Sequence, residues 1–173
     1  MTPVTSLPAP TGAPYRIAFV CLGNICRSPM ADVVLSQLVD DAGLAKKVEV
    51  SSCGTGTWHI GEPMDPRAAV QLLAEGYDAS AHRAQVFEAN WLEQDLVLAM
   101  DAQNLADITD GAGVSDRVRM FRSFDPLVAE SADPADLDVP DPFYGGDEGF
   151  ADVIRIVERT CRRILTELQA LGL

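Results

Sequence analysis

The sequence predicts an α/β fold, in which one domain holds a parallel four-stranded sheet with helices on both faces. Short apolar runs alternate along the chain with segments whose apolar residues recur every three or four positions. Chains with this alternation form parallel sheets that helices cover on both sides. The chain has 173 residues, 47% of them hydrophobic, which suits one domain with a full core.

Four apolar runs are predicted to be strands, and the last of them is the weakest. They are residues 15–21 (YRIAFVC), 47–53 (KVEVSSC), 95–100 (DLVLAM) and 117–124 (RVRMFRSF). None contains proline, and most of their residues are aliphatic, β-branched or aromatic, as strands prefer. The nearly continuous apolar character of the first run indicates a strand that is buried on both faces.

Four helices are predicted, at residues 28–43, 65–77, 102–109 and from Phe150 to Leu171. Ser28 is expected to cap the first helix, with Pro29 in its first turn and Gly43 at its end. Asp101 is expected to cap the third. The last helix has the clearest pattern, because its apolar residues follow the three-four spacing throughout.

Two segments are expected to lie outside these elements. Residues 1–14 carry no charged side chain and contain four prolines, so they are predicted to be a flexible N-terminal tail rather than a signal peptide. The domain then spans residues 15–173. Residues 125–149 are rich in Asp, Pro and Gly and are predicted to be a long loop. Loops of this length in compact domains are usually functional or disordered.

Composition excludes several classes of function. The net charge of −13 argues against nucleic acid and acidic membranes as partners, and no apolar run approaches the roughly 20 residues of a membrane span. Four cysteines are too few for a disulfide scaffold, so we expect free thiols in the cytoplasm. With only two histidines, and Cys21 and Cys26 five residues apart, no metal or other cofactor is expected.

The string CLGNICRS begins where the first strand ends and leads into the first helix. Ligands of parallel sheets bind beyond the carboxyl ends of the strands, and backbone N–H groups at a helix N-terminus bind anions. Gly23 and Asn24 tolerate the positive φ that such a loop requires, and Arg27 can hold two phosphate oxygens at once. The same positive field favours ionisation of Cys21 to a nucleophile, to which Ser28 can donate a hydrogen bond.

A lone cysteine and arginine would favour a structural role for both residues, but the whole string CLGNICRS is far more specific for a phosphate-binding loop. It matches the C-x5-R-[ST] phosphate loop of protein tyrosine phosphatases, and the chain resembles the low-molecular-weight protein tyrosine phosphatase family in particular. The resemblance covers nearly the whole chain from Tyr15. It includes four further segments in family order, at residues 51–68, 82–85, 99–101 and 139–146.

The resemblance implies a role for each matching position. Cys21 resembles the nucleophile, Arg27 the phosphate clamp and Asp141 the general acid that later acts as general base. The polar network that holds the loop rigid comprises Asn24, Ser28, Ser52 and His82. Leu22, Gly23, Ile25 and Cys26 complete the loop, and Cys26 resembles a cysteine that can form a disulfide with the nucleophile. The aromatic rim of the substrate cleft comprises Trp58, Phe143 and Tyr144.

The remaining candidate residues have plainer interpretations. From the residues alone, Cys26 fits structural packing as well as it fits redox protection. Cys53 and Cys161 occupy apolar positions and are expected in the core. His59, beside Trp58, is expected to be exposed and uninvolved.

The expected function is a protein tyrosine phosphatase that works through a phosphocysteine and releases inorganic phosphate. A tyrosyl leaving group, with a pKa near 10, asks for a proton donor, and the prolines on both sides of Asp141 stiffen the backbone that aims it. An aromatic rim makes a deep slot, which favours phosphotyrosine proteins or aryl phosphates over shorter phosphoserine. We expect a monomer or a weak dimer.

Three alternatives remain open from the sequence. A protein-arginine phosphatase of the same family would have Thr where this chain has Ile25. A thiol-dependent arsenate reductase would need further cysteines between Cys53 and Cys161, where this chain has none. A phosphate-binding module without catalysis would typically have lost Cys21, Arg27 or Asp141.

Overall fold

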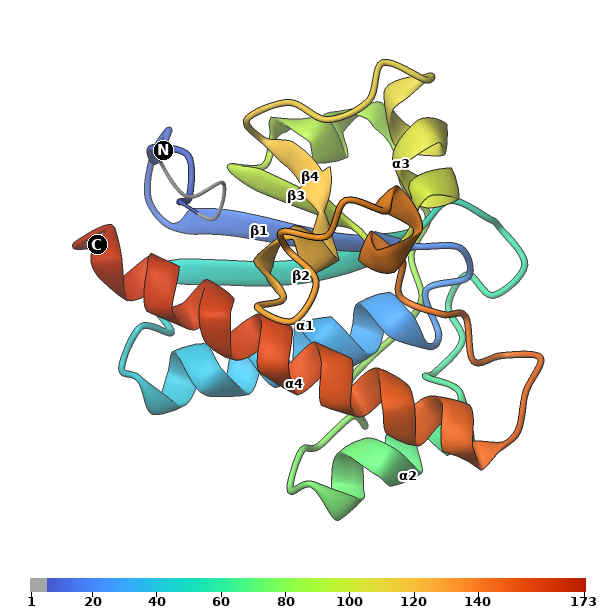
Figure 1. Cartoon of the computed structure of the whole chain (residues 1–173). Helices are drawn as coiled ribbons and strands as arrows, with labels where there is room; N and C mark the ends of the chain where they lie inside the picture. Colours follow the sequence, from blue (N-terminus) through green and yellow to red (C-terminus); the bar gives the residue numbers. More distant parts are fainter. Residues whose placement is uncertain (1–5) are drawn as a thin grey trace.

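Strands and helices alternate along residues 6–173, the part of the chain that the computed structural model describes (Figure 1). The strands are β1 (Tyr15–Cys21), β2 (Val48–Gly54), β3 (Leu96–Ala99) and β4 (Val118–Met120). They form one sheet in the order β2-β1-β3-β4, and all three neighbouring pairs are parallel. The predicted fold class is therefore confirmed.

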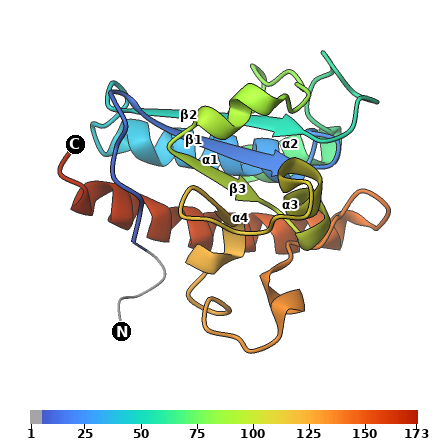
Figure 2. The same cartoon turned by 90° about the horizontal axis from the view of Figure 1, so that it is seen from above.

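The helices cover both faces of this sheet. They are α1 (Arg27–Asp41), α2 (Pro66–Ala74), α3 (Ala102–Thr109) and α4 (Asp147–Ala170). Helices α1, α2 and α4 lie on one face and α3 on the other (Figure 1). In Figure 2 the arrowheads of β1 and β2 point to the same end of the molecule, where the loops after β2 and before α4 also lie.

Successive residues of β1 belong to two separate cores. Ile17, Phe19 and Cys21 join the larger core beneath α1 and α4, whereas Val20 joins the smaller core with Ile108 of α3. Side chains of a strand alternate between the two faces of the sheet, and here both faces are buried. This explains why the run is apolar throughout rather than alternating with polar residues.

Two predicted boundaries differ from the structure in the last third of the chain. The fourth strand ends at Met120, because residues 121–124 form a 3₁₀ turn whose two phenylalanines are fully buried. Within the predicted loop 125–149, Pro134–Leu137 form another 3₁₀ turn and α4 already begins at Asp147. Acidic side chains in its first turn suit the positive end of the helix dipole, although they fall outside the apolar pattern.

Of the two side chains predicted to cap helices, one does so and the other does not. Asp101 caps α3 as expected, since its Oδ1 accepts a hydrogen bond of 2.7 Å from the Asn104 backbone N–H. Ser28 does not cap α1, because the helix starts one residue earlier, with Cys26 at the cap position and no side-chain bond there. The Ser28 hydroxyl turns instead toward Cys21.

The N-terminal segment contacts the domain from Ser6 onward, although it was predicted to be a flexible tail. The Thr11 backbone N–H and hydroxyl both donate to Asp95 Oδ1 at 2.8 Å. The Tyr15 hydroxyl donates to the Pro8 carbonyl at 2.9 Å. The first five residues of the predicted tail lie outside the described part of the chain.

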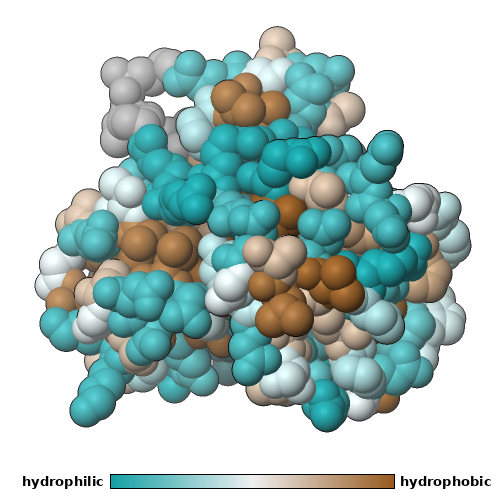
Figure 3. All heavy atoms as spheres, turned by 90° about the horizontal axis from the view of Figure 1, so that it is seen from below, coloured by the Kyte–Doolittle hydropathy of each residue, from teal (hydrophilic) through white to brown (hydrophobic). Residues whose placement is uncertain are grey.

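Polar side chains cover most of the face that Figure 3 shows, and apolar residues form smaller patches between them. No helix within residues 6–173 combines the length and the apolar character that crossing a membrane requires. The longest, α4, carries charged residues along its exposed side.

Candidate active site

A cavity of about 330 Å³ opens at the carboxyl end of β1. Its walls come from three segments that are far apart in the sequence: the start of α1 with the loop before it, the loop after β2, and the loop before α4. They contribute Cys21, Leu22, Gly23, Ile25, Cys26 and Arg27, then Trp58 and His59, and finally Asp141, Phe143 and Tyr144. The fold therefore gathers the predicted nucleophile, clamp, acid and rim around one cavity.

The sulfur of Cys21 is hydrogen-bonded to two groups of the phosphate loop, which we define as residues 21–28. The Asn24 backbone N–H donates to it at 3.3 Å, and the Ser28 Oγ lies 2.9 Å away. Asn24 Nδ2 donates to the same Ser28 oxygen at 2.8 Å, and the Ser28 hydroxyl has two acceptors within reach, the sulfur and the Cys53 carbonyl at 3.3 Å. Hydrogen bonds of this kind stabilise a negative charge on sulfur.

Asn24 is the centre of the polar network behind the loop. It is fully buried, and its φ of 56° lies in the left-handed region that asparagine tolerates. Its Nδ2 also donates to Ser52 Oγ at 3.0 Å, and its carbonyl accepts from His82 Nε2 at 2.7 Å. The predicted set of Asn24, Ser28, Ser52 and His82 is thus assembled, and it holds the strained turn in place.

His82 supports the loop in its neutral form. Burial lowers the pKa of His82, although its bond to the Asn24 carbonyl acts in the opposite direction. Since a carbonyl only accepts, the neutral ring carries its proton on Nε2. The imidazole therefore donates to the loop without adding a charge behind it.

Two members of this network were missing from the sequence interpretation. The backbone N–H of Gln85 donates to Asn24 Oδ1 at 2.9 Å, which satisfies the last polar atom of that side chain. Asp32 of α1 accepts from Ser52, and burial raises the pKa of its carboxyl to about 6. A main-chain donor has no sequence signal, while the spacing of Asp32 four residues after Ser28 could have pointed to the same helix face.

Arg27 is almost fully buried, and hydrogen bonds hold one of the two terminal nitrogens of its guanidinium. Nη1 donates to Asp101 Oδ2 at 2.6 Å and to the Val139 carbonyl at 3.0 Å, while Nη2 lies 3.4 Å from Asp141 Oδ2. Burial by itself lowers the pKa of Arg27, but the neighbouring Cys21, Asp101 and Asp141 raise it above the ordinary value. Asp101 thus uses one oxygen to cap α3 and the other to hold Arg27, a second role that the sequence analysis missed.

Asp141 lines the cavity, on a loop that is hydrogen-bonded to α2. Its Oδ1 accepts from the Phe143 N–H at 3.1 Å. Arg67 of α2 donates to the carbonyls of Phe143 and Gly145 at 3.0 and 3.1 Å, and Asp65 holds Arg67 through an ion pair of 3.0 Å. Arg67 therefore anchors the loop that carries the predicted acid, which sequence patterns did not indicate.

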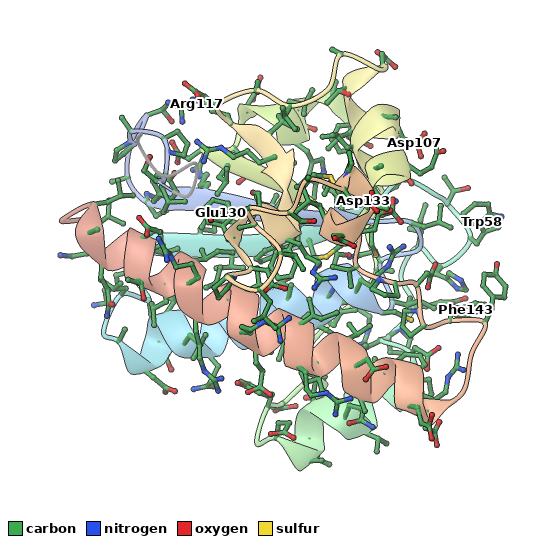
Figure 4. The ribbon with its side chains drawn as sticks, viewed as in Figure 1. Trp58, Asp107, Arg117, Glu130, Asp133 and Phe143 are labelled. Atoms are coloured by element: carbon green, nitrogen blue, oxygen red, sulfur yellow. The ribbon has the colours of Figure 1, made fainter. Side chains whose placement is uncertain are left out.

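The predicted aromatic residues form a rim around the cavity, and His59 joins them. Figure 4 shows Trp58 and Phe143 at the same side of the molecule. The rings of Phe143 and Tyr144 meet edge to face at 5.0 Å between centroids. His59 was expected to be exposed and uninvolved, but it is only partly exposed and lines the cavity: its Nδ1 lies 2.7 Å from Glu62 Oε2, and its ring packs beside Phe143.

All four cysteines are free thiols in the structure. Cys53 and Cys161 are fully buried in the two cores, as predicted. Cys26 lines the cavity beside Cys21, and burial raises the pKa of its thiol far above the ordinary range. Among residues 6–173, no three His, Cys, Asp or Glu side chains are grouped so as to hold a metal ion.

Gly54 at the end of β2 supports the loop from below. A β-carbon there would lie 2.7 Å from the Leu22 carbonyl oxygen and 3.0 Å from the Asn24 nitrogen, both of them backbone atoms. We expect Gly54→Ala to distort the loop, lower turnover at least tenfold and destabilise the fold by about 1–3 kcal/mol. Steady-state kinetics and thermal unfolding measure both effects. Gly12→Ala, where no atom lies within 4 Å, is the control, and equal behaviour of the two variants would contradict this account.

The comparisons with known proteins agree with this geometry. A family model for low molecular weight phosphotyrosine protein phosphatase matches residues 16–171. A low molecular weight protein-tyrosine-phosphatase of Streptomyces coelicolor is 45% identical over 159 residues, which cover 90% of this chain and 94% of that one. The phosphatase A of Mycobacterium tuberculosis is 44% identical over 146 residues, 84% and 86% of the two chains.

A solved structure shares the fold as well. The crystal structure of YfkJ from Bacillus subtilis superposes with a TM-score of 0.80 at 32% identity, over 92% of this chain and 98% of that one. The resemblance that the sequence motifs indicated is therefore confirmed. The chain belongs to the low molecular weight phosphotyrosine protein phosphatase family, and with it to the phosphoric monoester hydrolases.

Proposed function

We propose that this protein hydrolyses phosphotyrosine in proteins through a phosphocysteine intermediate on Cys21. The observation that carries the proposal is that one cavity holds a hydrogen-bonded thiol, a buried guanidinium and a carboxylic acid at its mouth. This combination supplies a nucleophile, a clamp for a dianion and a proton donor for the leaving group. Family membership supports the same chemistry.

In the first step the phosphoryl group sits in the phosphate loop above the ionised sulfur of Cys21. Its oxygens accept from the backbone N–H groups of the loop and from Nη2 of Arg27, which is the end of the guanidinium that Asp101 leaves available. The sulfur attacks phosphorus, the S–P bond forms and the bond to the tyrosyl oxygen breaks. Asp141 gives its proton to that oxygen, so that tyrosine leaves as a neutral phenol.

In the second step water replaces the leaving group at the mouth of the cavity. Asp141, now ionised, takes a proton from the water, whose oxygen attacks phosphorus. The S–P bond breaks, inorganic phosphate leaves and the sulfur keeps the electron pair. Ser28 and the Asn24 N–H stabilise the charge that returns to it. Neither step calls for a metal ion or an organic cofactor.

The rim favours an aromatic phosphate ester. Trp58, Phe143 and Tyr144 place flat rings around the entrance, and aromatic contacts add to the burial of a phenyl ring. Ile25 presents an apolar side chain to the same cavity, which suits a phenyl ring better than a guanidinium. The substrates proposed here are therefore proteins that carry phosphotyrosine.

The experiment compares hydrolysis of an aryl phosphate, a phosphotyrosine peptide and a phosphoarginine peptide, each with and without a chelator. We expect release of phosphate from the first two, insensitivity to the chelator, and an acid-quenched intermediate that carries phosphorus on Cys21. Faster release from phosphoarginine would overturn the substrate class. Binding of phosphate without turnover would overturn catalysis, and thiol-dependent reduction of arsenate would point to the reductase instead.

Asp141→Asn tests the acid role. We expect kcat for phenyl phosphate to fall about 100-fold, because a poor leaving group needs the proton, whereas nitrophenyl phosphate should slow far less. Stopped-flow measurement of phenol release for the two esters gives the ratio. Asp138→Asn is the matched control: it lies on the same loop, and an amide oxygen can still accept from the Ala102 N–H as the carboxylate does at 2.8 Å. Equal slowing of both esters would remove Asp141 from this role.

A further inference from the structure

The indole of Trp58 packs directly over Gly56, two residues earlier in the loop after β2. A β-carbon built on Gly56 would fall 3.0 Å from Cη2 of the indole and closer still to Cζ3 and Cε3. Such separations are shorter than carbon atoms in contact adopt. The observed placement of the ring therefore requires glycine at position 56.

Two main-chain hydrogen bonds hold the backbone at this point. The N–H of Gly56 donates to the Leu22 carbonyl at 2.8 Å, and the N–H of Thr55 donates to the Cys21 carbonyl at 3.0 Å. The loop after β2 is thus bonded to the first two residues of the phosphate loop. Any side chain at position 56 would displace the indole, whose side chain is largely exposed, rather than the main chain.

The placement of the indole matters because it forms a wall of the cavity. Trp58 lines the cavity together with Phe143 and Tyr144, which come from the loop before α4. The phosphate loop lies deeper, at the end of β1, so that a group bound there is reached through this rim. A change in the indole would therefore alter contacts with an aryl group and leave contacts with the phosphate intact.

We propose that Gly56 is a positioning residue that sets the aromatic wall of the substrate cleft through Trp58. The proposal deepens the function proposed above and rests on it for the identity of the substrate. The side of Gly56 that a β-carbon would occupy faces the indole, so a substitution there is expected to change recognition of the aryl part and not the chemical step. It also joins the wall to the phosphate loop, because the same residue bonds to Leu22.

The test measures Gly56→Ala with an aryl phosphate, with inorganic phosphate as inhibitor, and with benzylphosphonate as a ligand that cannot be hydrolysed. We expect KM for the aryl phosphate and Kd for benzylphosphonate to rise about three- to tenfold, as for the loss of one aromatic contact. We expect kcat to change less than twofold and the inhibition constant of inorganic phosphate to stay unchanged. A purely structural defect would move all four quantities.

A double-mutant cycle with Trp58→Ala identifies the route of the effect. Trp58→Ala alone should cause a similar rise, and adding Gly56→Ala should cause no further change, because the indole is already absent. The control is Gly12→Ala, outside the cavity lining, where a β-carbon meets no atom within 4 Å. Thermal unfolding should give the same midpoint for all variants.

Two outcomes would overturn the positioning role: unchanged benzylphosphonate binding in Gly56→Ala, or fully additive effects in the cycle. Neither depends on turnover, since both use binding constants. If the wild-type protein bound benzylphosphonate but hydrolysed no aryl ester, the proposed catalytic function would be wrong. The role of Gly56 in binding would still be decided by the benzylphosphonate affinities of the variants.

Discussion

Cys21→Ser is expected to lower kcat at least about 10⁴-fold while phosphate binding survives. A serine hydroxyl at this position is a far weaker nucleophile than an ionised sulfur, and the two groups bonded to Cys21, the Ser28 hydroxyl and the Asn24 N–H, are not bases that would activate it. The contacts that hold the phosphate come from the loop and from Arg27, and the Asn24 N–H and Ser28 can still bond to an oxygen. Steady-state kinetics on an aryl phosphate and calorimetric titration with inorganic phosphate measure the two properties separately.

Cys53→Ala is the matched control for the loss of a buried thiol. Cys53 faces the smaller core on the opposite side of the sheet and lies outside the cavity lining. Its removal should leave kcat within about twofold of the wild type, at a modest loss of stability. Substantial activity in Cys21→Ser, or recovery of the phosphorylated intermediate on another residue, would refute the nucleophile assignment.

Arg27→Lys is expected to lower kcat/KM by about 10²- to 10³-fold although it keeps the charge. In the structure the guanidinium makes contacts from both of its terminal nitrogens: Nη1 bonds to Asp101 and the Val139 carbonyl, and Nη2, which lies 3.4 Å from Asp141 Oδ2, is the nitrogen proposed to bind the phosphate. A lysine has one nitrogen at the end of its side chain. If that nitrogen stayed paired with Asp101, the phosphoryl oxygens would lose the donor that Nη2 supplies.

Arg159→Lys is the matched control, because it removes an arginine that makes two hydrogen bonds to a carboxylate outside the active site. Arg159 of α4 binds the fully buried Asp125 through two bonds of 2.7 and 2.8 Å, and neither residue lines the cavity. This variant should lower the unfolding midpoint and leave kcat/KM within twofold. Circular dichroism and steady-state kinetics on both variants make the comparison. A near-normal rate for Arg27→Lys would show that charge alone suffices.

The interactions that span few residues were predictable from the sequence. The strands and helices follow from hydrophobic spacing, because burial of an apolar face is the main energetic gain of each element. The phosphate loop was equally accessible: Cys21 and Ser28 lie within eight residues, so a strand–helix junction necessarily brings them together. Local rules still failed at Ser28, where the preference of serine for a cap position gave way to its bond with the sulfur.

The groups that orient these residues come from distant parts of the chain, and they became visible only in the folded molecule. Asp101 reaches Arg27 across 74 residues, and Arg67 holds the loop of Phe143 across 76. His59, which looked uninvolved, meets Phe143 because two loops converge at one end of the sheet.

Hydrophobic periodicity and a short motif therefore establish the α/β architecture and the family of this protein, and they predict its reacting residues. Tertiary packing alone determines three sets of contacts: those of Arg27 with Asp101 and Val139, those of Arg67 with the loop of Asp141, and that of Trp58 with Gly56. The physical reason is that side-chain direction and main-chain donors have no local pattern in sequence. They depend on which segments the folded sheet brings within about 3 Å of one another.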